Sequence, residues 1–409
     1  MNSQISICEY TTESNAQTDR PISFPWSGLL ALAMTGFICI LTETLPAGLL
    51  RQIGEGLHIS EALAGQLVTL YALGSLAAAI PLTTLTRSWR KKPLLLACIV
   101  GFLIFNSITA LSVHYIFILA ARFFAGMAAG VVWGMTAGYA RRMVPESMRG
   151  RAMAVAMCGT PLALALGVPA GTLLGHLIGW RLVFGVMSLL TVGLIVWVGY
   201  KLPDLSGQQD SQPLKLRSVL TLAGVGPVLI VVLVWVLAHN MLYTYIAPYL
   251  QASGWGERTG LVLLLFGLAS VAGIGLTGAW IDRWLRQLVL LSTAGFAAAA
   301  CVLGLASHLP LLLYTGIVLW GLTFGGAATL LQTALADSAG EHGDVAQSML
   351  VTMWNLAISG GGLVGGIVLE TLGVSFIPWL VSLLMLIAWG ITGLSRRHGF
   401  TSARNKNTA

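Results

Sequence analysis

The sequence predicts an all-α membrane protein whose twelve transmembrane helices form two six-helix bundles. Of its 409 residues, 56% are hydrophobic and only 9% are charged, whereas about 25% of a soluble domain is charged. The apolar residues gather in runs of about 20, which is the length of helix that crosses a bilayer. One long polar break, KLPDLSGQQDSQPLKLR at 201–217, divides these runs into six and six and has the composition of a linker.

The runs follow one another along the chain with short polar breaks between them. The first begins after the polar residues 1–23 and ends at Arg51, and the basic residues between 87 and 92 follow the second. The predicted spans are 26–50, 62–85, 93–113, 115–140, 151–177, 182–200, 220–250, 259–281, 287–306, 309–334, 345–369 and 374–395. An even number of spans places both termini on one side of the membrane.

The distribution of positive charge orients these spans. The tails and the even-numbered loops hold 18 of the 22 Lys and Arg residues, while the opposite face receives only Arg51, Arg181 and Arg258. By the positive-inside rule both termini are cytoplasmic, and we expect a multi-pass protein of the bacterial inner (plasma) membrane. The net charge of +7 is explained by these loops rather than by nucleic-acid binding. The predicted organisation is a cytoplasmic tail 1–23, a bundle 24–200, a cytoplasmic linker 201–218, a bundle 219–397 and a tail 398–409.

The two halves of the sequence are similar to each other. Basic residues occur at matching offsets in the break after span 2 (LTTLTRSWRKKPLLL) and in the break after span 8 (GAWIDRWLRQLVLL). Two six-span repeats favour a transporter over a receptor or an enzyme. No cluster with metal-ligand spacing and no phosphate-binding loop occurs, so we expect no metal, no cofactor and no enzymatic activity. Energy would come from an ion gradient.

Several motifs resemble the major facilitator superfamily and, within it, the twelve-helix drug:proton antiporter branch, over residues 24 to 397. The loop after span 8 matches the superfamily's cytoplasmic motif G-x-x-x-D-R-x-x-R with Gly278, Asp282, Arg283 and Arg286. The resemblance predicts that Asp282 faces residues 147–152 and pairs with Arg149 or Arg151 when the cytoplasmic side is closed. The first-half copy of the motif keeps Arg87, Arg90 and Lys91 but has Leu82 and Thr86 at the Gly and Asp positions, and is expected to lack a matching ion pair.

Two glycine patterns add to the resemblance. Arg122, Gly126 and Gly130 in span 4 look like the family's R-x-x-x-G motif, which is linked to proton coupling. Span 5 resembles the glycine-rich motif typical of exporters, although close helix packing explains its glycines equally well. The residues of that second motif are Gly159, Pro161, Gly167, Gly171 and Gly175. Together with TETLPAGLL, HNMLYTYIAPYL and NLAISGGGLVGG, they resemble the sugar-efflux and purine-ribonucleoside-efflux group.

Glu43 is the only carboxylate well inside a predicted span, and Arg122 is the only equally deep cation. Each lies about seven residues, or roughly 10 Å, below the outer surface, so the two share a depth. A charge near the bilayer centre costs about 2.5 to 3.5 kcal/mol even on lenient scales. One hypothesis is that Glu43 carries the driving proton and that its protonation frees Arg122. The other is a fixed ion pair that only orients two helices, although such a pair could be replaced by apolar residues at little cost.

Other polar residues in the spans are candidates for a substrate cavity. His239 could hydrogen-bond the substrate, serve as a second titratable group or join two helices. Tyr243 follows it on the same helical face. Trp133 and Trp320 could line the cavity or only pack, and the rest could instead satisfy backbone groups. The candidates are His239, Tyr243, Tyr245, Asn355, Gln66, Tyr71, Trp133 and Trp320.

These observations predict a proton-coupled antiporter that exports a small solute such as a sugar, a nucleoside or a drug by alternating access. The alternative with the same fold is a proton-coupled uptake symporter or an uncoupled facilitator. A receptor or structural membrane protein fits poorly, because the loops are too short to hold a partner domain. The expected partners are the substrate, protons and the lipid bilayer, with no nucleic acid, and we expect the protein to act as a monomer.

Overall fold

A computed structural model describes residues 24–79, 81–86, 88–145, 148–207, 219–306, 309–340, 343–395 and 399–400. In the first half of this described part, helices follow one another with short connections. They are α1 (Trp26–Gly48), α2 (Leu50–Leu57), α3 (Glu61–Ala79), α4 (Pro81–Leu85), α5 (Lys91–Leu111), α6 (Tyr115–Arg142), α7 (Arg149–Met157), α8 (Gly159–Leu162), the π-helix η2 (Ala163–Gly167), α9 (Val168–Ile178) and α10 (Trp180–Lys201).

The second half is also helical. Its elements are α12 (Val225–Thr244), α13 (Ile246–Ala252), the 3₁₀-helix η3 (Gly256–Arg258), α14 (Thr259–Ala306), α15 (Pro310–Gly325), α16 (Ala327–Ala339), α17 (Gly343–Thr371), the 3₁₀-helix η5 (Val374–Phe376) and α18 (Ile377–Leu394). Twelve helical segments within the described residues are long and apolar enough to cross a membrane. The predicted number of spans is therefore confirmed.

Two predicted spans differ from the structure in how they end or bend. The first helix stops at Gly48, and α2 begins after Leu49, whose φ is −122° and ψ is 10°. The predicted run 220–250 is divided into α12 and α13 at Tyr245, where φ is −106° and ψ is 22°. Spans 8 and 9 are separate, as predicted; the label α14 covers both, and they are divided at Trp284, whose φ is −131° and ψ is 23°. Hydropathy does not report the breaks at Leu49 and Tyr245, because they leave the apolar run uninterrupted.

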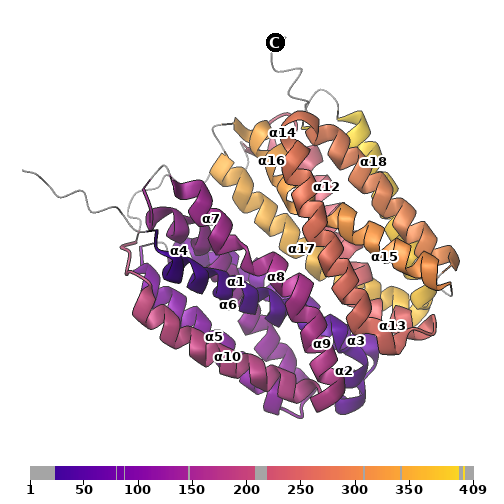
Figure 1. The fold of residues 1–409 in the computed structure, drawn as a ribbon, viewed down its shortest axis with the longest axis horizontal. Helices are drawn as coiled ribbons and strands as arrows, with labels where there is room; N and C mark the ends of the chain where they lie inside the picture. Colours follow the sequence, from indigo (N-terminus) through magenta and orange to yellow (C-terminus); the bar gives the residue numbers. More distant parts are fainter. Residues whose placement is uncertain are drawn as a thin grey trace, which may run out of the picture.

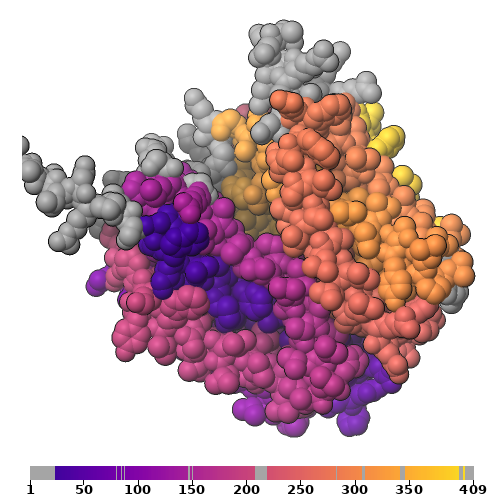
Figure 2. Space-filling view, viewed as in Figure 1, coloured from indigo at the N-terminus to yellow at the C-terminus, as the bar shows by residue number. Residues whose placement is uncertain are grey.

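The two bundles lie side by side, the first drawn in indigo to magenta and the second in orange to yellow (Figure 1). Elements of the two bundles pack across the boundary between them, including α3 against α17, α9 and η2 against α14, and α1 against α12 and α13. We call the end where α1 begins and α18 ends the tail end, and the end with α2 and α13 the far end. Near the far end the surfaces of the bundles meet, whereas a recess lies between them toward the tail end (Figure 2).

Close residue-to-residue contacts between the bundles occur from the middle of the spans to the far end. The ring of Tyr245 lies against Gly65, and Thr69 lies against Gly362. A Cβ added at Gly267 would lie 2.4 Å from the Cα of Ala165. Contacts this close leave no room for a pathway at these positions. The state described here is consequently closed at the far end and recessed at the tail end.

Candidate functional site

Glu43 lies in α1, one of the helices at the boundary between the bundles. The residue is buried, with 7% of its surface exposed. Its carboxylate has no ion-pair partner within 4 Å among the described residues. Arg122 of the first bundle and Tyr243 of the second both lie within its electrostatic range. Glu43 is therefore a buried acid placed between the two bundles.

Arg122 of α6 is fully buried beside Glu43. Its guanidinium donates to three main-chain carbonyls: Nη2 to Thr42 at 2.5 Å and to Glu43 at 3.3 Å, and Nε to Leu67 at 3.3 Å. It also lies 4.9 Å from the ring centre of Tyr71, within the range of a cation–π contact. Nη1 has no hydrogen-bond partner among the described residues. In this state Arg122 binds the backbone of α1 rather than the Glu43 carboxylate.

Two further polar side chains support this arrangement. Asn106 of α5 donates to the hydroxyl of Thr42 over 3.0 Å, and the Tyr71 hydroxyl donates to the carbonyl of Cys39 over 3.0 Å. Both therefore hold the stretch of α1 whose carbonyls receive Arg122. Sequence reasoning did not select Asn106 or Thr42. The available signal was that Asn106 interrupts the apolar run LLLACIVGFLIFNSITAL well inside its span.

The span-5 glycines lie against α1. A Cβ added at Gly159 would lie 1.8 Å from the carbonyl oxygen of Ala33, and one at Gly171 would lie 2.5 Å from Leu45. A Cβ at Gly167 would meet Phe37 of the same helix, and one at Gly175 would meet Leu49, which directly follows that helix. Pro161 precedes the π-helical turn η2, and Pro169 follows it, in the region that packs on α14. The glycines thus allow α1 to pack closely against span 5. The π-helical turn η2 lies where the first bundle contacts α14 of the second.

Three of the candidate cavity residues gather in one cluster, and the others make separate contacts. His239, Tyr243 and Trp320 form a buried aromatic cluster in the second bundle. Tyr245 is fully buried and donates to the carbonyl of Gly362 over 2.7 Å. The amides of Gln66 and Asn355 donate to carbonyls of their own helices. Trp133 is half-buried against Gly36 of α1.

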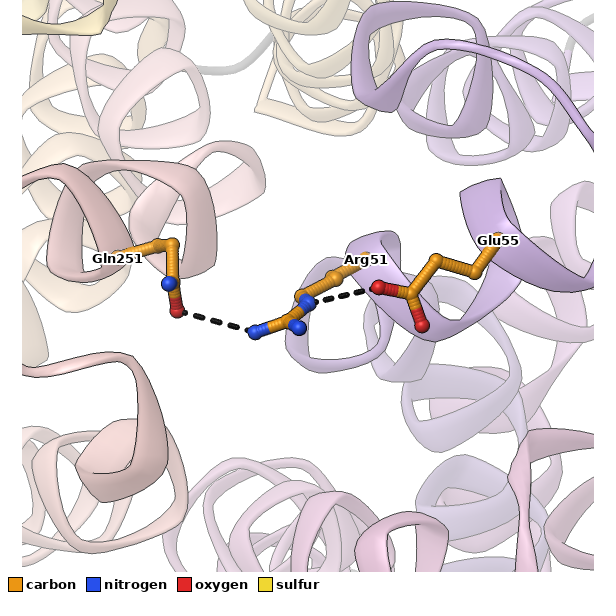
Figure 3. A network of polar contacts seen from close by, with 3 residues as sticks. All are labelled: Arg51, Glu55 and Gln251. Carbon is orange, nitrogen blue, oxygen red and sulfur yellow. Dashed lines mark hydrogen bonds and ion pairs between the residues drawn. The ribbon is translucent and has the colours of Figure 1, made fainter.

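At the far end, polar contacts connect the bundles. Arg51 donates to the Glu55 carboxylate over 2.8 Å and to the side-chain oxygen of Gln251 in the other bundle over 3.3 Å (Figure 3). The hydrogen bond with Glu55 raises the pKa of Arg51. Ser60 likewise donates to Glu370 across the boundary over 3.0 Å. These contacts are exposed, so they are individually weak. Arg51, Glu55 and Gln251 also line an open surface depression of about 390 Å³.

The first-half loop motif contains an ion pair that the sequence analysis did not expect. Arg90 pairs with Asp204 at 2.5 Å, and the backbone N–H of Lys92 donates to the same carboxylate over 3.4 Å. Asp204 follows α10 at the start of the linker. This pair is not the counterpart of the contact predicted for Asp282, so the expectation that the Thr86 copy lacks a matching ion pair stays a prediction. The Thr86 hydroxyl donates to the carbonyl of Leu82 in its own helix.

Residues 202–207 lie along the tail end of the first bundle. The Tyr139 hydroxyl donates to the carbonyl of Pro203 over 2.5 Å, and Arg142 donates to the carbonyl of Ser206 over 2.8 Å. The backbone N–H of Lys91 donates to the carbonyl of Leu205. Four consecutive residues, 203–206, therefore bind the first bundle through main-chain or side-chain oxygen atoms.

Asp204→Asn is expected to loosen this segment slightly, because an ion pair with one exposed partner contributes about 0.2–1 kcal/mol. We expect limited proteolysis between the bundles to become a few-fold faster, with little change in melting temperature. Glu257→Gln, which removes an exposed far-end carboxylate, is the matched control and should leave the cleavage rate unchanged. Equal cleavage rates for Asp204→Asn and wild type would contradict the role given to this pair.

The second-half loop motif is only partly described. The side chains of Asp282 and Arg87 lie outside the described residues, as does Ser147, so the predicted contact of Asp282 with residues 147–152 stays a prediction. Arg283 is exposed, and Arg286 donates to the carbonyl of Gly393 over 3.0 Å. A Cβ at Gly278 would meet no atom within 4 Å. Arg149 begins α7 at the tail end.

The structure has two helical bundles that meet at one end, and a buried acid and a buried cation lie inside the spans. This arrangement defines the class of the protein, a membrane transporter. A family model described as Major Facilitator Superfamily matches residues 32–342 and 256–407. The chain belongs to this superfamily.

Curated relatives match most of the chain. The purine ribonucleoside efflux pump NepI of Escherichia coli is 30% identical over 369 residues, which make up 88% of this chain and 92% of the relative. The NepI pump of Shigella dysenteriae serotype 1 matches with the same identity and coverage.

Solved structures share the fold. The nucleoside transporter NupG has a TM-score of 0.75 at 13% identity, over 91% of this chain and all of that chain (100%). A bacterial homologue of the human lysosomal transporter Spinster, in an inward-facing and occupied conformation, has a TM-score of 0.69 at 15% identity, over 92% of this chain and 98% of that chain. At such identities these likenesses concern the fold alone.

Proposed function

We propose that this protein is a proton-coupled antiporter of the bacterial inner membrane that exports purine ribonucleosides. The observation that supports coupling most is the buried Glu43 carboxyl, which has no ion-pair partner among the described residues and lies beside the Arg122 guanidinium. An ionisable residue at membrane depth is costly and commonly marks an ion or proton pathway. The choice of cargo is supported by the NepI relatives, which are named for purine ribonucleoside efflux.

Coupling follows from the two partners available to Arg122. With Glu43 protonated, the guanidinium rests on the carbonyls of Thr42, Glu43 and Leu67, which is the arrangement described here. When Glu43 loses its proton, the new carboxylate attracts Nη1, the guanidinium nitrogen that has no partner among the described residues. This change pulls on α1, which packs against α12 and α13 of the other bundle. Proton exchange therefore biases the contact between the bundles.

The tail end is the cytoplasmic end in this proposal. Basic residues of the described part are concentrated there, including Arg90, Arg141, Arg142 and Lys201, as the positive-inside rule requires. The recess then opens to the cytoplasm, where an exporter takes up its substrate. Substrate binding and deprotonation of Glu43 favour closure at this end, and the far end opens to release the substrate.

Binding and proton release together test the proposal. Adenosine, guanosine and inosine are expected to raise the melting temperature of the detergent-solubilised protein, because a ligand at 100 times its Kd stabilises by about 2.7 kcal/mol. In weakly buffered solution near neutral pH, adding the nucleoside should release protons, and Glu43→Gln should release none. Ribose and sucrose are the controls for cargo class.

Three results would contradict parts of this scheme. Stabilisation by sugars but not by nucleosides would overturn the cargo. Binding without proton release would favour the uncoupled facilitator. Proton uptake on substrate binding would favour the symporter, because a symporter binds the proton and the substrate together.

A further inference from the structure

A buried aromatic cluster surrounds His239 in the second bundle. The imidazole stacks on Phe324 with 3.4 Å between ring centres and 5° between planes. Tyr243, Phe266 and Trp320 lie at 5.4, 5.7 and 5.5 Å from it. Trp320 is fully buried, and His239 retains 6% of its surface exposed. The rings hold the imidazole in one orientation.

Trp320 determines which tautomer of His239 is present. Its indole nitrogen can only donate a hydrogen bond, and it lies 3.2 Å from Nδ1 of His239. Nδ1 must then present its lone pair, because an N–H at this position would face another N–H. A neutral imidazole with a free lone pair on Nδ1 carries its proton on Nε2. His239 is therefore a hydrogen-bond donor at Nε2, and this contact opposes its protonated form.

His239 lies on the same side of α12 as Tyr243, and the proposed transport pathway runs between this side and the first bundle. His239 and Tyr243 are four residues apart and share one face of α12. Tyr243 lies within electrostatic range of Glu43 in the other bundle, so this face is turned toward α1. His239 is one helical turn closer to the tail end, on the side where the recess opens. No described residue accepts a hydrogen bond from Nε2.

We propose that His239 determines base specificity by donating its Nε2–H to an in-plane ring nitrogen of the purine, and that Trp320 is a positioning residue that fixes the donor tautomer. This inference rests on the proposed function for the class of substrate. A site built to hydrogen-bond a substrate discriminates strongly against an analogue that lacks the partner atom, because a buried donor is left unsatisfied. The same fixed donor makes His239 a poor carrier of the coupled proton, which leaves that role to Glu43.

The three ring acceptors of adenosine can be removed one at a time, which makes the proposal testable. We would measure the binding of adenosine and of 1-deaza-, 3-deaza- and 7-deazaadenosine to purified protein. One analogue is expected to bind about tenfold more weakly than adenosine, which corresponds to about 1.4 kcal/mol. His239→Phe keeps a flat ring but has no donor, and should bind adenosine and that analogue equally.

Trp320→Phe tests the positioning role. It keeps an aromatic ring and removes the indole N–H, so the tautomer is no longer fixed and the tenfold discrimination should shrink several-fold. The ¹⁵N chemical shifts of His239 should show the Nε2–H tautomer in the wild type and a mixture in Trp320→Phe. This signature does not depend on transport or on the identity of the substrate. Trp389→Phe, an exposed tryptophan of α18, is the control and should change neither readout.

The outcomes separate the two proposals. If the wild type binds no purine ribonucleoside, the proposed function fails and the specificity role fails with it. If the wild type discriminates but His239→Phe discriminates equally, the role of His239 is overturned while the proposed function stands. A wild-type spectrum with the proton on Nδ1 overturns the tautomer assignment regardless of binding. If Trp320→Phe fails to fold, His239→Phe still tests the donor role of His239, and the wild-type spectrum still tests its tautomer.

Discussion

Glu43→Gln is expected to abolish export driven by a pH gradient. Glutamine has nearly the same shape as glutamic acid but cannot release a proton, so Arg122 keeps its bonds to the carbonyls of Thr42, Glu43 and Leu67 throughout the cycle. In proteoliposomes with an imposed pH gradient, accumulation of a radiolabelled purine ribonucleoside should fall to background. Nucleoside binding should remain measurable but become weaker than in the wild type, because the amide imitates the protonated acid, and binding that releases a proton is weaker to the protonated form.

The matched control for this prediction is Glu257→Gln, which removes an exposed carboxylate outside the boundary between the bundles and should pump at the wild-type rate. Equal amounts of Glu43→Gln and wild-type protein in the membrane would exclude a folding defect. If Glu43→Gln still concentrated nucleoside against a gradient at the normal rate, Glu43 would not be the coupling residue. A loss of abundance rather than of pumping would favour the fixed-pair hypothesis, in which Glu43 only orients helices.

Gly126→Leu is expected to prevent folding of the first bundle. A Cβ at this position would lie 1.9 Å from the carbonyl oxygen of Tyr71 and 3.0 Å from the backbone nitrogen of Ser75. Gly74 has the converse contact, 1.9 Å from the carbonyl oxygen of Phe123, so α3 and α6 touch backbone to backbone and neither can yield. Overpacking alone costs about 1–3 kcal/mol and occasionally more, and separating these helices would also break the bond from Arg122 to Leu67.

The control for Gly126→Leu is available in the same helix. Gly138 has no atom within 4 Å of an added Cβ, so Gly138→Leu changes the same residue type in α6 without a clash. Monodisperse protein after detergent extraction should fall below about a tenth of the wild-type level for Gly126→Leu, since losing about 1.4 kcal/mol changes an equilibrium tenfold, and should stay near it for Gly138→Leu. Normal yield and melting temperature for Gly126→Leu would show that α3 and α6 can separate.

The features that sequence could predict are those set by the bilayer. Its thickness fixes the length of an apolar helix, so the number of spans follows from counting, and the depth of Glu43 and Arg122 follows from the rise per residue. Breaks inside a span were beyond prediction, because the residues around Tyr245 and the π-helical turn at 163–167 are as apolar as their neighbours.

Partners within the site could not be predicted for a different reason, which is that they come from distant parts of the chain. Opposite charge at equal depth indicated a Glu43–Arg122 pair, but the guanidinium binds carbonyls, and every helix offers carbonyls without any sequence signal. The tautomer of His239 depends on a tryptophan 81 residues away. Asn106 was visible as a polar residue in an apolar run, but its contact with Thr42 was not.

The attachment of residues 203–206 to the first bundle bears on how this transporter can be cut into halves for reconstitution from separately expressed pieces. A cut at residue 200, which hydropathy suggests, would remove Asp204 from Arg90 and Pro203 from Tyr139 and leave those groups exposed to water. A gene fragment that stops after Gly207 retains them. Co-expression of residues 1–207 with residues 208–409 should therefore yield more assembled transporter than co-expression of 1–200 with 201–409, although both pairs encode every amino acid of the intact chain.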